Sequence, residues 1–166
     1  MSRQPQNATP VDGLFESHLL VSDLDRSVGF YRDVVGLEVA YELPARDAVL
    51  LWIGRPGGAM LGLWSAGSAP LGMRLHLAFS AALADVLSAP EVLRGRGVTP
   101  RSFYGDEADE PDAIGWMPAA AVYFEDPDGN LLEYLAMLDQ PSRPDLGIVS
   151  WSQWQAAAAD RPHRAR

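Results

Sequence analysis

Three side chains of metal-ligating type stand inside predicted strands: His18, His76 and Glu133. Two neutral imidazoles and one carboxylate can hold a divalent cation and leave coordination positions open for water or substrate, which suits catalysis better than structure. The chain has no cysteine, so thiolate ligands, disulfides and a catalytic thiol are excluded. Fe, Mn, Ni, Zn and Co all remain candidates. The third histidine, His163, lies in an Arg- and Pro-containing tail and is not a predicted ligand.

An internal repeat relates these residues. The segment 18–22 matches 76–80 at an offset of 58, and 56–62 matches 127–133 at an offset of 71. A lone His or Glu in a strand is usually structural, but two of three histidines at equivalent repeat positions favour a shared site. The duplication predicts a pseudo-two-fold fold whose equivalent positions face each other across one cavity. Gly62, which matches Glu133, has no side chain, and this predicts a gap beside the metal that is either room for substrate or a lost ligand.

Strand alternation indicates the surroundings of the histidines. Glu16 shares a strand face with His18, and Arg74 shares one with His76. Faces that carry charges are not expected to be wholly buried. We therefore expect them to line a cup that solvent can reach.

The elements that position these residues follow the order βαβββ twice, an α+β pattern. In the first module, we predict a helix that begins at the N-cap Ser22 and ends at Gly36, because apolar residues recur there with helical spacing. Strands are predicted at residues 14–21, 37–43, 48–53 and 59–64.

In the second module, Ser80 is the predicted N-cap of a helix that runs toward Gly95, with a possible restart at 88–91. Strands are predicted at residues 73–79, 98–104, 119–124 and 130–137. A long acidic loop, 105–118, separates two of them, and loops of this length are often functional.

The predicted organisation is a disordered tail at 1–12, modules at 13–68 and 69–138, and an extension at 139–166. In the extension, Ser150 and Gln153 form a capping box that opens a short helix through Ala159. Trp151 and Trp154 are expected to pack this helix onto the body.

Composition excludes several partners. The formal net charge of −9 repels phosphate backbones and anionic membranes, so no nucleic acid is expected. We interpret Arg94, Arg96 and Arg101 as the exposed end of a helix. No run of 18 apolar residues and no secretory signal is present, which predicts a cytoplasmic protein without a membrane partner.

Two segments, 18–37 and 122–133, resemble the vicinal oxygen chelate superfamily, which includes glyoxalase I, extradiol dioxygenases, fosfomycin-resistance enzymes and bleomycin-resistance proteins. The resemblance covers about residues 13–138. It implies two βαβββ modules that form a cupped, partly open barrel, with His18, His76 and Glu133 matching the family's metal ligands. It also implies a small-molecule substrate and a homodimer.

Departures from the subfamilies leave the reaction open. Glyoxalase I has a carboxylate at the position of Gly62, extradiol enzymes have a histidine near 114–116, and fosfomycin-resistance enzymes have a Lys- and Arg-rich pocket. This chain has none of these features. Lyase, isomerase, transferase and dioxygenase chemistry remain possible, with Tyr123 or Tyr104 as acid or base. The alternative is a metal-free drug-binding protein of the bleomycin-resistance type.

Four further residues are candidates for binding substrate: Trp116, Gly62, Trp64 and Arg74. Trp116 lies at the end of the acidic loop, where a ring could close over a ligand. Tryptophans within a sheet, such as Trp64, belong more often to the core or to a dimer interface.

Overall fold

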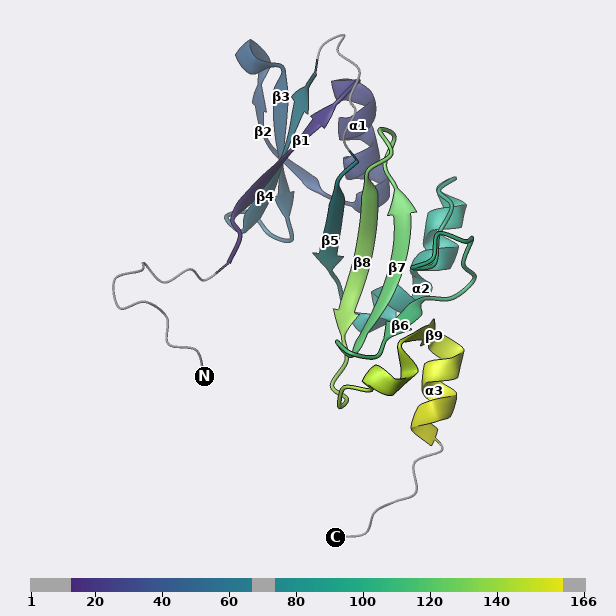
Figure 1. Ribbon diagram of the computed structural model, residues 1–166. Helices are drawn as coiled ribbons and strands as arrows, with labels where there is room; N and C mark the ends of the chain where they lie inside the picture. The colour runs from purple at the N-terminus through teal and green to yellow at the C-terminus, as the bar shows by residue number, and fades with distance from the viewer. Residues whose placement is uncertain (1–12, 67–73, 160–166) are drawn as a thin grey trace, which may run out of the picture. The chain divides into compact units, whose positions relative to one another are not determined.

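The computed structural model describes residues 13–66 and 74–159, which fall into two compact units, Met1–Leu71 and Gly72–Arg166 (Figure 1). The predicted tail at 1–12 lies outside the described residues. So does the predicted module boundary between 68 and 69. Each unit consists of one sheet with its own helices, and neither sheet is closed.

The first unit has the predicted βαβββ order. Helix α1 runs from Leu24 to Phe30 and continues into one π-helical turn, Tyr31–Val35. The strands are β1 (Glu16–Val21), β2 (Glu38–Leu43), β3 (Ala48–Ile53) and β4 (Ala59–Ser65), with a short 3-10 helix at Pro44–Arg46. They pair in the order β1-β4-β3-β2, with β1 parallel to β4 and the other pairs antiparallel.

The start of α1 differs from the prediction by one residue. Asp23, not Ser22, is the N-cap, and its side chain accepts a hydrogen bond from the Arg26 backbone amide at 3.0 Å. The Ser22 hydroxyl instead accepts a hydrogen bond from the Arg26 guanidinium at 2.8 Å. The predicted end at Gly36 is confirmed, because this residue adopts φ of 86°, which favours glycine.

The second unit contains β5 (His76–Ser80), α2 (Leu83–Gly95), β6 (Asp112–Ile114), β7 (Ala119–Glu125), β8 (Leu131–Met137), β9 (Ile148–Ser150) and α3 (Trp151–Ala159). A 3-10 helix, Pro144–Leu146, precedes β9. The strand order is β5-β8-β7-β6-β9, with β5 parallel to β8. Strand β9, which comes from the extension, was not predicted.

The predicted strand at 98–104 is wrong. Only Arg101 pairs there, in isolated bridges to Tyr123 and Glu107, because the chain turns at once into a loop closed by the hydrogen bond from Ser102 N to Asp106 O. Strand β6 takes the position beside β7 instead. It lies within the segment predicted to be a loop.

Two details of α2 also differ from the sequence interpretation. Ser80 belongs to β5, and the N-cap is Ala82, which makes no side-chain capping bond. No restart occurs at 88–91, because α2 continues through Pro90. Val86 and Leu93 are buried with Pro90, so burial of this face outweighs the hydrogen bond that a proline cannot make.

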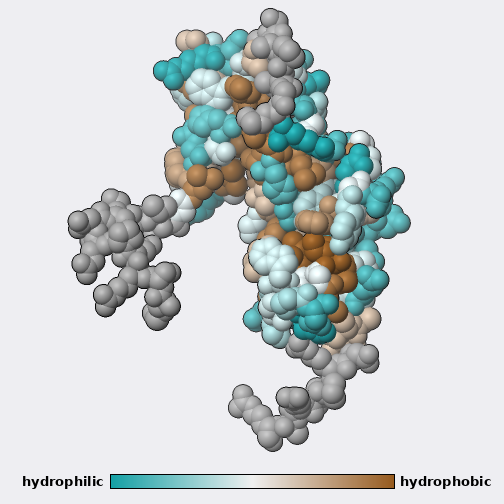
Figure 2. All heavy atoms as spheres, in the orientation of Figure 1, coloured by the Kyte–Doolittle hydropathy of each residue, from teal (hydrophilic) through white to brown (hydrophobic). Residues whose placement is uncertain are grey.

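The two faces of the second sheet have different roles. Helix α2 packs against β7 and β8 on one face (Figure 1). The opposite face carries a smaller cluster of Ile114, Ala121 and Tyr123, and hydrophobic side chains gather on the surface over the β6–β7 end of this sheet (Figure 2).

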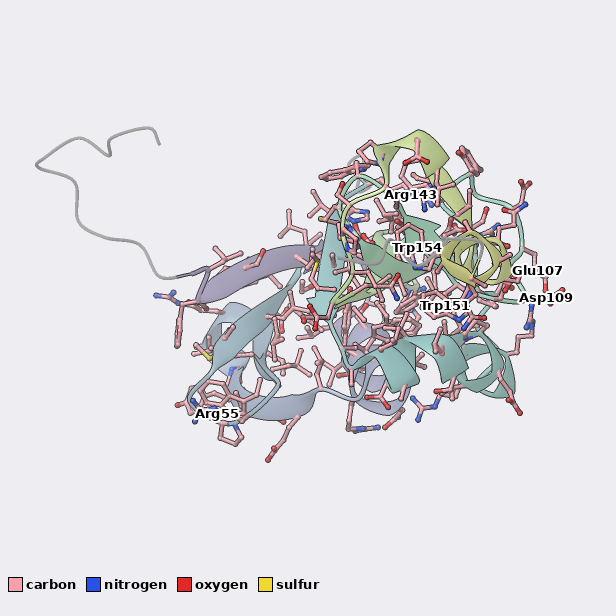
Figure 3. The ribbon with its side chains drawn as sticks, turned by 90° about the horizontal axis from the view of Figure 1, so that it is seen from below. Arg55, Glu107, Asp109, Arg143, Trp151 and Trp154 are labelled. Atoms are coloured by element: carbon pink, nitrogen blue, oxygen red, sulfur yellow. The ribbon has the colours of Figure 1, made fainter. Side chains whose placement is uncertain are left out.

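The C-terminal extension completes the core behind the sheet. The predicted capping box is confirmed: Ser150 N donates to Gln153 Oε1 at 3.1 Å, and Gln153 N donates to Ser150 Oγ at 3.4 Å. Trp154 is buried among Val86 and Ala120, and Trp151 packs beside them (Figure 3). No helix in the described ranges has the length and hydrophobicity needed to cross a membrane.

Candidate functional site

The second unit brings two predicted ligands together. His76 lies at the start of β5 on an exposed face, and Glu133 lies on the adjacent β8. His76 Nε2 is 3.0 Å from Glu133 Oε2. The Glu133 side chain is buried, and the residue is only 5% exposed.

The other oxygen of Glu133 points to a missing partner. Among the described residues, Glu133 Oε1 is the buried side-chain polar atom that has no hydrogen-bond partner. A buried carboxylate oxygen without a partner is costly, so such atoms call for an explanation. Two ligands bound at about 2.1 Å in adjacent octahedral positions lie about 3.0 Å apart. The 3.0 Å between His76 Nε2 and Glu133 Oε2 is an ordinary hydrogen-bond distance, and it also fits two ligands of one cation.

Tyr123 lies beside this pair. It faces Glu133 across β7–β8, and its ring centre is 6.3 Å from that of His76. Burial, followed by the negative charge of Glu133, raises the pKa of Tyr123. The raised pKa makes loss of the phenol proton still less favourable, which suits a hydrogen-bond donor and not a base.

A pocket of about 510 Å³ opens next to His76. Tyr123, Tyr104 and Arg74 line it, and so do Arg101 and Glu125. The Arg74 guanidinium pairs with Glu125, and Arg101 Nε is 3.7 Å from the same carboxylate.

Sequence reasoning missed Arg101, Phe103 and Glu125 as pocket residues. Arg101 was interpreted as part of the exposed end of a helix, but α2 ends at Gly95 and Arg101 bridges to β7. The detectable signal was two adjacent aromatic residues, Phe103 and Tyr104, just before Gly105 in a polar segment.

The first unit holds His18 differently. Its Nδ1 accepts a hydrogen bond from the Trp64 indole N–H, and its Nε2 is 3.1 Å from Glu16 Oε1. His18 lies opposite Gly62 in the β1–β4 pair. A Cβ at Gly62 would lie 2.7 Å from His18 Nδ1, so the imidazole already occupies the space that the sequence interpretation left open.

Strand register also corrects the repeat. Gly62 pairs with His18, whereas its sequence match Glu133 pairs with Ala78, two residues beyond His76. The offsets of 58 and 71 therefore do not describe one common register. A shift of two residues keeps the same strand face, which explains why the sequence pattern looked consistent.

The structure brings together His76, Glu133 and Tyr123, while His18 belongs to the other unit and has partners of its own. Within residues 13–66 and 74–159, no group of three or more His, Asp or Glu side chains is arranged to hold a metal ion. Trp116 is 62% exposed, does not line the pocket, and has a carbonyl that accepts a hydrogen bond from Ser142 Oγ at 2.9 Å.

Comparisons with known proteins agree with this architecture. A family model described as the Glyoxalase/Bleomycin resistance protein/Dioxygenase superfamily matches residues 13–134. An integron cassette protein from the mobile metagenome of the Halifax Harbour sewage outfall is 26% identical, with a TM-score of 0.64, over 76% of this chain and 100% of that chain. No match was found among the curated proteins.

Two further structures are similar. Lactoylglutathione lyase from Agrobacterium tumefaciens is 25% identical, with a TM-score of 0.59, over 77% of this chain and 96% of that chain. The fosfomycin resistance protein FosX from Mesorhizobium loti is 20% identical, with a TM-score of 0.57, over 78% and 96%. The likeness to FosX concerns the fold alone.

Proposed function

The chain belongs to the glyoxalase/bleomycin resistance protein/dioxygenase superfamily, and from that premise we propose that it is a divalent-metal-dependent enzyme acting on a small oxygenated molecule. The observation that carries the proposal is the buried Glu133 Oε1 without a partner, next to His76. His76 and Glu133 would hold the ion, and His18 is the sequence-based candidate for a third ligand. Fe, Mn, Ni, Zn and Co are the candidate ions.

The chain's own residues provide the rest of the chemistry. A bound divalent ion polarises a substrate oxygen and stabilises negative charge that develops on it. Tyr123, whose phenol is protonated at neutral pH, can donate a hydrogen bond to such an oxygen. Tyr104 lies on the pocket wall, where it can contact the substrate. This arrangement is compatible with lyase, isomerase, transferase and dioxygenase reactions. The proposal also includes a homodimer.

Metal titration tests the proposal. The untagged chain, stripped with chelator, should bind about one equivalent of at least one of the five ions. His76→Ala and Glu133→Ala should each weaken binding by more than about 100-fold, since removal even of residues that only orient ligands costs about 10–100-fold. His163→Ala and Glu91→Ala are the matched controls, because His163 is not a predicted ligand and Glu91 is an exposed residue of α2.

The rival hypothesis is a metal-free binding protein of the bleomycin-resistance type. The pocket lined by Arg74 and Arg101 supports it, because these guanidinium groups can hold an anionic compound without an ion. Failure of all five ions to bind, or to raise the melting temperature, would overturn the metal-dependent proposal and favour this one.

A further inference from the structure

The pocket beside His76 contains more positive charge than the chain as a whole would suggest. Its volume of about 510 Å³ is in the range of small-molecule sites. Arg74 and Arg101 both approach Glu125, so two guanidinium groups share one carboxylate. Glu133 does not line the pocket and is paired with His76. Among the residues that line the pocket, arginines thus outnumber carboxylates two to one, in a protein of net charge −9.

The same pocket exposes two aromatic rings. Phe103 is 51% exposed and Tyr104 is 70% exposed, and the two rings meet edge to face at 5.4 Å. Phe103 also meets Tyr123 edge to face at 6.0 Å. Adjacent large rings in contact with water lose hydrophobic stabilisation, so an exposed pair at a pocket indicates a binding surface.

Hydrogen bonds hold the loop that carries these rings. The Phe103 backbone amide donates to the buried Asp112 carboxylate at 2.6 Å, and the Tyr104 amide donates to Ser102 Oγ at 3.2 Å. The guanidinium of Arg101 donates to the Gly105 carbonyl at 3.0 Å. The charge and the rings are thus pre-positioned, which lowers the entropy cost of binding a ligand.

We infer that this pocket binds a planar aromatic monocarboxylate, with its carboxylate on the guanidinium nitrogens of Arg74 and Arg101 that do not face Glu125 and its ring against Phe103 and Tyr104. A guanidinium matches a carboxylate through two parallel hydrogen bonds, and the excess of one arginine over the lining carboxylate favours a single carboxylate group over a dianion. The inference rests on the proposed function, because it names the class of compound that would be the substrate at the His76–Glu133 site. The residues that recognise it are not the proposed metal ligands.

Calorimetric titration of the chelated full-length chain with benzoate tests the inference. Benzoate should bind more tightly than cyclohexanecarboxylate, which has the same charge but a puckered ring, and more tightly than inorganic phosphate. Arg101→Gln should weaken benzoate binding by about tenfold or more, since a hydrogen bond between charged groups is lost. Tyr104→Leu should weaken benzoate and leave cyclohexanecarboxylate unchanged.

Arg143→Gln is the matched control. Arg143 also belongs to an arginine–carboxylate pair in the second unit, with Asp145 at 2.8 Å, but it does not line this pocket (Figure 3). This variant should bind benzoate as the unmodified chain does. Melting curves of every variant should confirm that the fold is retained.

Three outcomes would overturn the inference: no benzoate binding, equal binding of all three anions, or Arg101→Gln binding benzoate unchanged. Glu133→Ala separates it from the proposed function, because that variant should lose the metal and keep benzoate. Metal binding without benzoate binding would overturn the inferred substrate class and leave the proposed metal-dependent function intact. Benzoate binding without metal binding would overturn the proposed metal-dependent function and leave the inferred ligand class intact.

Discussion

His18 and His76 come from matching segments of the two units, yet their surroundings differ. In the first unit, the imidazole lies over Gly62, and both of its nitrogens have partners, Trp64 and Glu16. In the second unit, His76 meets a buried carboxylate that still lacks one partner, beside a pocket. Duplicated strands can thus keep a residue type while the surrounding side chains decide how many hydrogen-bond partners it has.

The largest effect is expected from removing the Glu133 carboxylate, one oxygen of which has no partner. Glu133 lies between Leu131 and Leu135 on one face of β8, so Glu133→Leu should fit without strain. In chelator, the variant should be more stable than the unmodified chain by about 2 kcal/mol, because a buried charge without full pairing is removed. Urea unfolding measures this difference. Glu133→Gln removes only the charge, so its free energy of unfolding should lie between those of the Leu variant and the unmodified chain. A Leu variant no more stable than the unmodified chain would contradict the contrast between the units.

A second, smaller effect concerns Gly62. Gly62→Ala places a methyl group against His18, so we expect a loss of about 1.5 kcal/mol in the free energy of unfolding. In a His18→Ala background most of this cost should disappear, because only the flexible Leu50 side chain, 3.1 Å from the added Cβ, remains in the way. A double-mutant cycle by urea unfolding measures the coupling. Equal costs in both backgrounds would show that the imidazole does not fill this space.

A third effect tests His18 as a ligand. With Nδ1 accepting from Trp64, a neutral imidazole carries its proton on Nε2, so that nitrogen can bind metal only if the Trp64 bond is lost. Trp64→Phe removes this competition, and metal affinity should rise about fivefold, equivalent to a hydrogen bond of about 1 kcal/mol. Metal titration measures the change. The increase should vanish in a His18→Ala background, and its persistence there would exclude His18 as the third ligand.

The smallest effect concerns the support of the pocket loop in the second unit. Burial raises the pKa of Asp112 above its ordinary value of 3.8, against the opposing hydrogen bond from Phe103 N. A raised pKa in the folded state contributes stability below pH 3.8 that is lost as pH rises through the folded-state value. Asp112→Asn does not titrate, so its stability relative to the unmodified chain should increase from pH 3 to neutral. Urea unfolding at a series of pH values checks this sign, and a difference that is flat or falls with pH would contradict it.

The sequence by itself determined the family, the α+β class and most elements. Alternation, turn residues and caps are local signals, so β3, the end of α1 at Gly36 and the Ser150–Gln153 capping box were predicted correctly. His76 and Glu133 were placed in strands correctly for the same reason, since residue type and strand face are readable along the chain.

Tertiary structure decided what neighbouring strands and loops do to these residues. Pairing with β7 makes residues 112–114 a strand, β6, where the sequence predicted a loop. Pairing with β7 also places Arg101 at the pocket and not at the end of a helix. Register between β1 and β4 put the His18 imidazole over Gly62, and register between β7 and β8 placed Tyr123 beside Glu133. These contacts join residues far apart in the chain, and their free energy depends on which atoms meet across strands, so no local pattern could reveal them.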